Sequence, residues 1–302
     1  MIRVVVTGGE GQLGRALARE APEGWDLRVL PRSRLDVTDP EEVRAVLGSL
    51  RPQWVVNAAA YTRVDQAEAE PERAAAVNRG GARHVAEACA AVGARMVQVS
   101  TDYVFDGTKG SPYRPDDPPN PVNAYGRTKL GGERAVLDVL GDRACVLRTA
   151  WVYSVEGPSF LTTLLRLLPE RDELRVVEDQ IGTPTSAVSL ARAVVRIVER
   201  GVAGVHHWTD AGVASWYDFA VAIAEELHAR GRLPRMPRIA PIPTSAYPTP
   251  ARRPPYSVLD KTATRGVLGL KPAHWRVELT ESLDVVFGEP LRGRQGHGIP
   301  AE

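Results

Sequence analysis

Short apolar runs that are rich in valine alternate with longer alanine-rich segments through the first half of the chain. The long segments repeat their apolar residues at helical spacing, whereas the short runs have the length and composition of buried strands. A repeated order of strand, helix and strand gives parallel strands joined by right-handed crossovers. The sequence therefore predicts an α/β fold built on a doubly wound, parallel sheet of the Rossmann type. The expected strands cover residues 2–7, 27–30, 54–59, 95–100 and 144–149, and the expected helices cover residues 41–50, 71–92 and 123–140.

After residue 150 the regular alternation of strand and helix patterns ends. Residues 174–200 read as a strand, a loop and one more helix that returns to the sheet, so the second part is interleaved with the first. The expected units are a dinucleotide-binding domain over 1–150, joined by part of 174–200, a smaller α/β substrate-binding domain over 151–287 and a flexible tail over 288–302.

Prolines crowd residues 231–255, which predicts a loop there and no helix. Tyr247, Arg252 and Arg253 lie within this segment. They suit an ordered loop over an anionic ligand, and a proline-rich recognition segment is the alternative.

The composition suits a soluble globular protein whose partners have to be inferred from local sites. The chain has 302 residues, of which 43% are hydrophobic, so it can bury a large core. Its formal net charge of +1 gives no field that would gather nucleic acid or an anionic membrane. Cys89 and Cys145 lie in apolar runs without metal or redox spacing, which favours a reducing, cytoplasmic setting. The chain opens on its first apolar run and no run approaches the length of a membrane span, so we expect no export signal and no membrane helix.

A glycine-rich turn at residues 8–14 follows the first expected strand directly and leads into a helical pattern. Glycine lets the backbone turn tightly and approach a pyrophosphate, while a helix N-terminus offers free N–H groups to the phosphates. Gly8, Gly11 and Gly14 are the three glycines expected to do this. Their spacing differs from the common Gly-x-Gly-x-x-Gly, and glycine clusters also mark ordinary turns. The position after the first strand is what favours a dinucleotide site.

The residues after the second strand indicate which dinucleotide is preferred. An acidic residue there holds the ribose 2′-hydroxyl of NAD, whereas an arginine accommodates the 2′-phosphate of NADP. Arg32 occupies this region, which favours NADPH, with NADH as the other possibility; a solvated surface arginine is the alternative interpretation. Asp36 is expected to face the adenine end of the cofactor.

Tyr125 and Lys129 lie four residues apart at the start of the helix expected over 123–140, so they share one helix face. An ammonium group beside a phenol lowers its pKa from about 10 and makes the tyrosine a usable acid near neutral pH. Thr101 follows the strand over 95–100, so its hydroxyl lies at the carboxyl end of a parallel strand, where ligands bind. Together these residues predict a nicotinamide-dependent reductase.

Chance explains the tyrosine–lysine spacing poorly. Eight tyrosines and four lysines, at positions 109, 129, 261 and 271, predict only about 0.1 such pairs in a chain of this length. The alternative is a half-buried core tyrosine next to an exposed helix lysine.

These motifs resemble those of the extended short-chain dehydrogenase/reductase family and, within it, the subfamily of dTDP-4-dehydrorhamnose reductases. The resemblance covers nearly the whole chain, to about residue 287. The motifs that carry it are residues 11–14, 56–65, 100–105, 125–129, 148–153, 179–185, 215–219 and 247–254.

The resemblance implies reduction of the 4-keto group of dTDP-4-dehydro-6-deoxy-L-mannose to dTDP-L-rhamnose. In that chemistry Tyr125 supplies the proton, Thr101 hydrogen-bonds the substrate oxygen, and Lys129 holds the nicotinamide ribose. The other residues implied to bind the cofactor are Gln12, Leu13, Val37, Ala58, Ala59, Ala60, Tyr61, Thr62, Asn78 and Ser100. Those implied to bind the substrate are Asp102, Trp151, Arg252 and Arg253, with the two arginines facing the diphosphate.

The resemblance also implies a homodimer, and some relatives are associated with Mg²⁺. No carboxylate cluster in the sequence identifies a metal site. Two other functions stay open. One is a nucleotide-sugar epimerase or epimerase-reductase that retains NAD(H), and the other is a non-catalytic subunit like the regulatory subunit of methionine adenosyltransferase. The substrate's base is not fixed by the residues either.

Overall fold

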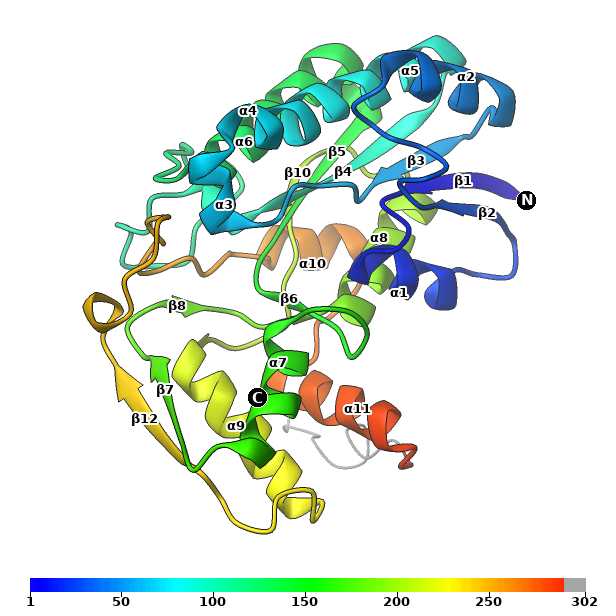
Figure 1. Ribbon diagram of the computed structural model, residues 1–302. Helices are drawn as coiled ribbons and strands as arrows, with labels where there is room; N and C mark the ends of the chain where they lie inside the picture. Colours follow the sequence, from blue (N-terminus) through cyan, green and yellow to red (C-terminus); the bar gives the residue numbers. More distant parts are fainter. Residues whose placement is uncertain (291–302) are drawn as a thin grey trace.

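A computed structural model describes residues 1–290 and contains a central parallel sheet of six strands (Figure 1). The strand order is β10-β5-β4-β3-β1-β2, and every neighbouring pair runs parallel. The strands are β1 (Ile2–Thr7), β2 (Trp25–Leu30), β3 (Trp54–Asn57), β4 (Arg95–Thr101), β5 (Ala144–Thr149) and β10 (Gly204–His207).

Helices cover both faces of this sheet. The alternation along β1 shows why: Val4 and Val6 pack into one hydrophobic cluster, and Val5 packs into another on the opposite face. The first cluster includes residues of α1 (Gln12–Glu20) and α8 (Ala187–Arg200), and the second includes residues of α2 (Pro40–Leu50), α5 (Ala82–Val92) and α6 (Ala124–Leu140). The predicted doubly wound α/β fold is therefore confirmed.

The chain reverses its direction of winding between β1 and β3. It leaves β1 for β2 at one edge and then returns to the other side of β1, which makes this the topological switch point of the sheet. In open α/β sheets the ligand crevice lies at such a point, outside the carboxyl ends of the strands. Thr7 and Asn57 end the two strands here, and the Thr7 hydroxyl donates a 2.6 Å hydrogen bond to Asn57.

The segment between β3 and β4 is less regular than the single helix predicted over residues 71–92. It forms α3 (Val64–Ala69), α4 (Pro71–Ala75), a π-helical stretch η1 (Ala76–Gly81) and then α5. Gly132 of α6 packs closely on this stretch, since a Cβ at Gly132 would lie 2.2 Å from the carbonyl oxygen of Asn78. A short 3-10 turn, η2 (Asp102–Val104), follows β4.

A second, smaller α/β region lies below the sheet in Figure 1 and has its own core. Leu161, Phe219, Ile223, Trp275 and Leu279 are fully or almost fully buried in it. Its longer elements are α7 (Phe160–Leu167), β7 (Glu173–Val177), α9 (Trp216–Ala229), β12 (Arg238–Ile242) and α11 (Trp275–Phe287). The remaining short elements of the chain are η3 (Gly141–Arg143), β6 (Val152–Tyr153), η4 (Leu168–Glu170), β8 (Ile181–Gly182), β9 (Thr185–Ser186), β11 (Ala214–Ser215), η5 (Thr244–Ala246) and α10 (Thr262–Leu268).

The prediction of an unbroken loop over residues 231–255 is wrong for its middle part. Residues Arg238–Ile242 form β12, which pairs in parallel with β7 in a two-stranded sheet. Pro241 lies within this strand. Each strand of a two-stranded sheet is an edge strand, and an edge strand tolerates proline because one side of its backbone needs no ladder partner.

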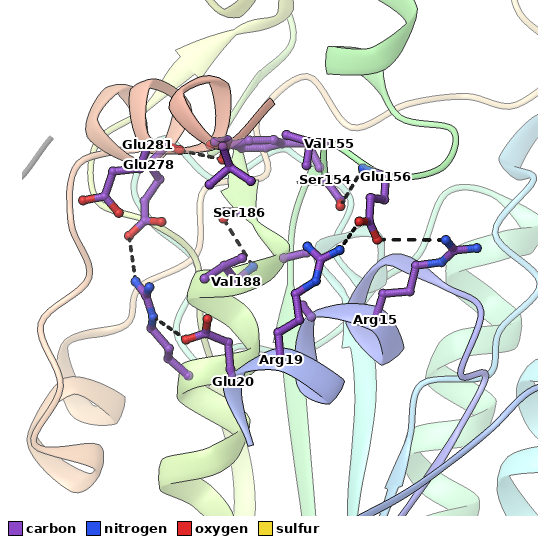
Figure 2. Close-up of a pocket in the computed structure, with 16 residues that line it drawn as sticks. Arg15, Arg19, Glu20, Ser154, Val155, Glu156, Ser186, Val188, Glu278 and Glu281 are labelled. Atoms are coloured by element: carbon purple, nitrogen blue, oxygen red, sulfur yellow. Dashed lines mark hydrogen bonds and ion pairs between the residues drawn. The ribbon is translucent and has the colours of Figure 1, made fainter. Parts of the chain in front are cut away.

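Ion pairs join the second region to helices α1 and α8 (Figure 2). Glu156, in the loop after β6, forms ion pairs with Arg15 and Arg19 of α1. Arg192 of α8 pairs with Glu20 of α1 at 2.9 Å and approaches a carboxylate of α11. The junction between the two regions is therefore charged on both sides.

The end of α11 is tied down, because Glu289 forms an ion pair with Arg230. Most of the predicted flexible tail, residues 291–302, lies outside the described residues. Within residues 1–290 no helix combines the length and the apolar character needed to cross a bilayer.

Two glycine-to-alanine substitutions test the packing of α6. Gly132→Ala should lower the free energy of unfolding by about 1–3 kcal/mol, because its methyl group would overlap the Asn78 carbonyl. Gly48→Ala in α2 is the matched control: a Cβ there meets nothing within 4 Å, so it should raise stability by about 0.5–1 kcal/mol. Thermal and denaturant unfolding measure both; equal effects of the two substitutions would contradict the packing described.

Candidate functional site

The glycine turn after β1 adopts a conformation that side chains would block. Gly8 has φ +67°, and a Cβ there would lie 2.7 Å from the backbone nitrogen of Ala59. A Cβ at Gly14 would lie 2.7 Å from the Cα of Gly9. Gly11 caps α1 without a side-chain hydrogen bond, so no side chain occupies the first N–H groups of the helix. The turn fits the close approach of a pyrophosphate.

A cavity of about 340 Å³ lies beside this turn, at the carboxyl ends of β1, β2 and β3. Of the residues predicted to bind the cofactor, it brings together Gly8, Arg32, Asp36, Val37, Ala59, Ala60 and Tyr61. Sequence reasoning missed its other lining residues, which are Leu35, Thr38, Arg73, Ala76 and Val77. Arg73, Ala76 and Val77 come from α4 and η1, and nothing in their local sequence pattern signals that this segment folds back over the cavity.

Arg32 and Asp36 form an ion pair at this cavity. Arg32 donates from Nε and Nη2 to the same Asp36 carboxylate oxygen at 3.0 and 2.8 Å. Thr38 adds hydrogen bonds from its backbone nitrogen and its hydroxyl. Burial opposes ionisation of Asp36, but these hydrogen bonds and the Arg32 charge together lower its pKa. Arg32 is thus held by an ionised partner while its side chain stays 69% exposed.

Asn78 lies in the π-helical stretch and supports Tyr61. Its side-chain oxygen accepts from the Tyr61 backbone nitrogen at 2.8 Å, and its side-chain nitrogen donates to the Tyr61 carbonyl at 3.1 Å. The same nitrogen donates to Thr128 of α6 at 3.0 Å. Asn78 therefore joins the segment after β3 to the helix that carries Tyr125 and Lys129.

Other predicted cofactor residues have mixed surroundings. The Leu13 side chain is buried in the hydrophobic core and Ala58 packs against the same cluster, whereas Thr62 is exposed. Gln12 donates to the carbonyl of Pro158 at 3.4 Å. Ser100 donates to Glu133 at 2.5 Å, so its hydroxyl is already engaged.

Thr101 and Tyr125 meet at the carboxyl end of β4. The Thr101 hydroxyl donates to the Asp102 carboxylate at 3.0 Å and lies beside the Tyr125 side chain, whose ring packs edge-on against Tyr103. The approach depends on Gly126, because a Cβ there would lie 2.1 Å from the carbonyl oxygen of Tyr103. Asn123 caps the helix by accepting from the Gly126 nitrogen at 2.8 Å. The local sequence thus fixes Tyr125 in the first turn of α6, beside Thr101.

The expected lowering of the Tyr125 pKa is wrong for this geometry. Burial raises the pKa of Tyr125 to about 12, the hydrogen bond with Thr101 opposes this change, and the charge of Asp102 adds to it. The Lys129 ammonium group donates to the carbonyl of Val99 at 2.6 Å. A tyrosine with this pKa is fully protonated at neutral pH.

Lys129 and Asp102 are both almost completely buried, with 3% and 2% of their surfaces exposed. Burial lowers the pKa of Lys129 to about 8, and the charge of Glu133 opposes it. Burial raises the pKa of Asp102 to about 6, against hydrogen bonds that include those of Ser257 and Thr101. Two ionisable groups near Tyr125 therefore have pKa values displaced toward neutrality, which is typical of functional sites.

Trp151 has a left-handed backbone conformation, with φ +47°, which is rare for a bulky residue. Its ring stacks on Trp216 with a centroid distance of 3.6 Å. Gly182 lies against it, since a Cβ there would come within 2.5 Å of the Trp151 ring. Such strain persists where the surroundings hold a residue firmly, often at ligand sites.

The two predicted diphosphate arginines have different environments. Arg253 forms a two-pronged ion pair with Asp65, with distances of 3.1 and 2.8 Å. Arg252 has an exposed side chain, and its carbonyl accepts a 2.8 Å hydrogen bond from Asn123. The loop that carries both arginines is thereby fixed to the start of α3 and to the start of α6. Asp65 is a residue that the sequence motif contained but to which no role was predicted.

Within residues 1–290 no group of three or more histidine, cysteine, aspartate or glutamate side chains is arranged to hold a metal ion.

Comparison with known proteins agrees with this geometry. A family model described as "RmlD substrate binding domain" matches residues 2–287. The "dTDP-4-dehydrorhamnose reductase" of Streptomyces griseus is 43% identical over 99% of this chain and 97% of its own length. The "dTDP-4-dehydrorhamnose reductase" of Burkholderia thailandensis is 44% identical over 91% of this chain and 96% of its own.

Solved structures support the same relationship. The crystal structure of the dTDP-4-dehydrorhamnose reductase of Bacillus anthracis, in complex with NADP, superposes with a TM-score of 0.88 at 35% identity, covering 94% of this chain and 99% of that one. The UDP-glucose 4-epimerase of Thermotoga maritima, at 19% identity and a TM-score of 0.79 over 95% of this chain and 99% of its own, shares the fold. From these matches, the chain belongs to the RmlD substrate binding domain family.

Proposed function

We propose that this protein is a dTDP-4-dehydrorhamnose reductase, which uses NADPH to reduce the 4-keto group of dTDP-4-dehydro-6-deoxy-L-mannose to dTDP-L-rhamnose. The similarity to proteins of that name over almost the full length of both chains carries this proposal. The neighbouring hydroxyl groups of Thr101 and Tyr125, beside the predicted dinucleotide crevice, support it chemically.

The side chains have complementary tasks in this reaction. When bound, NADPH supplies the hydride that reaches the carbonyl carbon. Tyr125 is protonated at neutral pH and donates its proton to the carbonyl oxygen as negative charge develops there. Thr101 donates a hydrogen bond to the same oxygen and keeps Tyr125 in place. Lys129 holds the nicotinamide ribose with its buried ammonium group.

The glycine turn and the Arg32–Asp36 pair fit NADPH. Backbone N–H groups in the first turn of α1 receive the pyrophosphate, because no side chain caps that helix end. Arg32 is preoriented by Asp36 and yet largely exposed, so its remaining donors are free to receive a 2′-phosphate.

The second region holds the sugar nucleotide in this proposal. Residues 1–150 with α8 and β10 bind the dinucleotide, and most of residues 151–287 bind the substrate, with Trp151 against the sugar and Arg252 at the diphosphate. We also propose a cytoplasmic homodimer, as the family resemblance implies. The two buried, unpaired cysteines suit a reducing compartment, and light scattering tests the dimer.

Consumption of NADPH in the presence of the dTDP-4-keto sugar tests the function directly. Loss of NADPH absorbance with formation of dTDP-L-rhamnose is the expected result. No consumption with the dinucleotide still bound would favour a non-catalytic regulatory subunit. Purification with tightly bound NAD(H) that persists through turnover would favour an epimerase.

Tyr125→Phe tests the proton donor. This variant keeps the ring and its packing but loses the hydroxyl, so kcat should fall by about 10²–10⁴-fold while NADPH binding stays. Tyr217→Phe, in helix α9 of the second region, is the control and should retain activity. Unchanged turnover in Tyr125→Phe would remove Tyr125 as the acid.

Arg32→Ala tests the cofactor preference. Losing the charge-assisted contacts to a 2′-phosphate should raise the Kd for NADPH by about 10–100-fold and leave the Kd for NADH nearly unchanged. Arg28→Ala removes an exposed arginine of β2, the strand that precedes Arg32, and should change neither Kd. Fluorescence titration with both dinucleotides measures this, and equal weakening of the two would show that Arg32 does not discriminate.

A further inference from the structure

A buried ion pair lies one helical turn beyond Lys129. Glu133 of α6 and Arg148 of β5 are 2% and 4% exposed. Arg148 donates from Nη2 to Glu133 Oε2 at 2.8 Å and from Nε to Oε1 at 3.0 Å. The Ser100 hydroxyl donates to the same carboxylate at 2.5 Å. Glu133 thus receives donors from two strands of the sheet while it lies on the helix that carries Tyr125 and Lys129.

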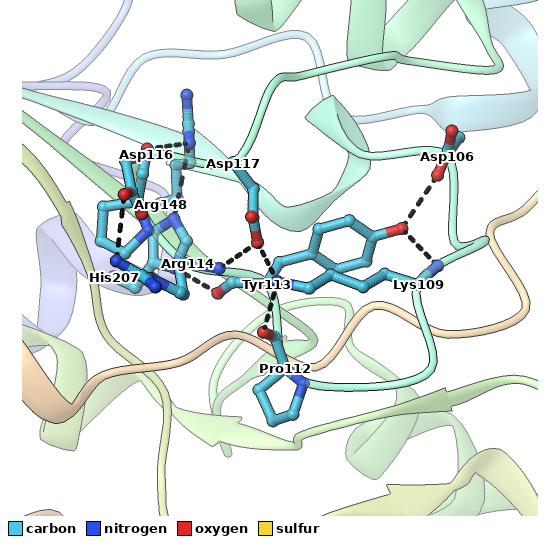
Figure 3. A network of polar contacts seen from close by, with 10 residues as sticks. Asp106, Lys109, Pro112, Tyr113, Arg114, Asp116, Asp117, Arg148 and His207 are labelled. Atoms are coloured by element: carbon cyan, nitrogen blue, oxygen red, sulfur yellow. Dashed lines mark hydrogen bonds and ion pairs between the residues drawn. The ribbon is translucent and has the colours of Figure 1, made fainter.

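The other side of Arg148 reaches the segment over residues 106–117, which connects the end of β4 to α6 (Figure 3). Arg148 Nη1 donates to the carbonyl of Pro115 at 3.2 Å and lies 3.5 Å from Nε2 of His207. Burial, together with the Arg148 charge, lowers the pKa of His207 to about 3, so its ring is neutral. His207 Nδ1 can therefore donate to the Tyr113 carbonyl at 3.1 Å while Nε2 accepts from Arg148.

The titratable groups around Lys129 come from several elements. Tyr125 and Glu133 lie on its own helix, Asp102 and Tyr103 on η2, Arg148 on β5 and His207 on β10. On the outer side of α6, Arg79, Arg83, Arg127, Arg134 and Asp138 line a separate groove. At the start of α6, Glu68 accepts from the backbone nitrogen of Ala124. Among all of these, Glu133 is the group whose charge favours the ammonium form of Lys129.

A buried ammonium ion needs a nearby negative charge, because its transfer from water to the protein interior is strongly unfavourable. The direct partner of the Lys129 ammonium is a neutral carbonyl, that of Val99. We propose that Glu133 is a positioning residue that keeps Lys129 charged. Through Arg148, Glu133 also fixes residues 106–117, which lie between β4, the strand of Thr101, and α6, the helix of Tyr125. The proposal relies on the proposed function only for the task of the charged lysine.

The small number of lysines makes a direct test possible. The chain has four, so labelling with ¹³Cε-lysine gives four NMR signals, and Lys129→Met assigns that of Lys129. Glu133→Gln keeps the size of the side chain but removes its charge, so the titration midpoint of Lys129 should fall by about one pH unit or more. Glu133→Asp keeps the charge and should cause less than half of that shift.

Two controls separate this effect from general disturbance. Asp138→Asn removes the same charge from the exposed side of the same helix and should leave the Lys129 midpoint unchanged. Lys261 is buried next to Thr209, and its pKa is also lowered to about 8, first by burial. It should titrate identically in every sample and thereby reports on the integrity of the fold.

Glu133→Gln leaves Arg148 buried without its ionised partner, so the variant can fail to fold. The double variant Glu133→Gln/Arg148→Met removes both charges and should still show a lower Lys129 midpoint. If the protein reduces the keto sugar, the alkaline limb of the pH profile of kcat/KM should move to lower pH in the same variants.

An unchanged Lys129 midpoint in either folded variant overturns the proposal. Failure of both variants to fold would show a purely structural pair and also overturn it. The NMR titration needs no substrate, so it stands even if the reductase assay fails.

Discussion

Close backbone packing of helix α6 is the constraint on which the candidate site depends. Gly126 and Gly132 bring the helix so near to the carbonyls of Tyr103 and Asn78 that even a methyl group would overlap them. Tyr125, Lys129 and Glu133 all lie on this helix, so their distances to β4 and β5 follow from these contacts. The chemistry proposed for the protein is therefore a consequence of helix packing as much as of residue identity.

Polar side chains cross the sheet at the carboxyl ends of its strands. The Thr7 hydroxyl donates to Asn57, Asn57 donates to Gln98, and Gln98 donates to the Val99 carbonyl that also receives Lys129. Each buried polar group in this row has a partner, which avoids the cost of leaving it unsatisfied. The row links the switch point, where the dinucleotide is proposed to bind, with the lysine proposed to hold its ribose.

The sequence allowed most of the sheet to be predicted, because a buried strand and an amphipathic helix each have a recognisable period. The helix after Asn123 begins within one residue of its predicted start, and the glycine turn has the conformation that its glycines imply. The predictions that failed depend on distant partners. Pro241 predicts a loop from the local sequence, but pairing with β7 places it in an edge strand. The Tyr125 pKa depends on burial, which the spacing of nearby residues does not reveal. The contacts of Arg253 with Asp65 and of Arg148 with His207 could not be predicted either, because these partners lie far from the arginines in the chain. The individual binding roles of the site residues stay predictions.

The loop with Arg252 and Arg253 affects how the protein folds during its synthesis. Its anchors, Asn123 and Asp65, precede it by 129 and 188 residues in the chain. Contacts of such separation slow folding, because a long loop must close before they can stabilise the protein. During synthesis the glycine turn leaves the ribosome early, but the loop cannot dock before residue 253 has emerged. A nascent or truncated chain can therefore form much of the sheet before it has a complete pocket.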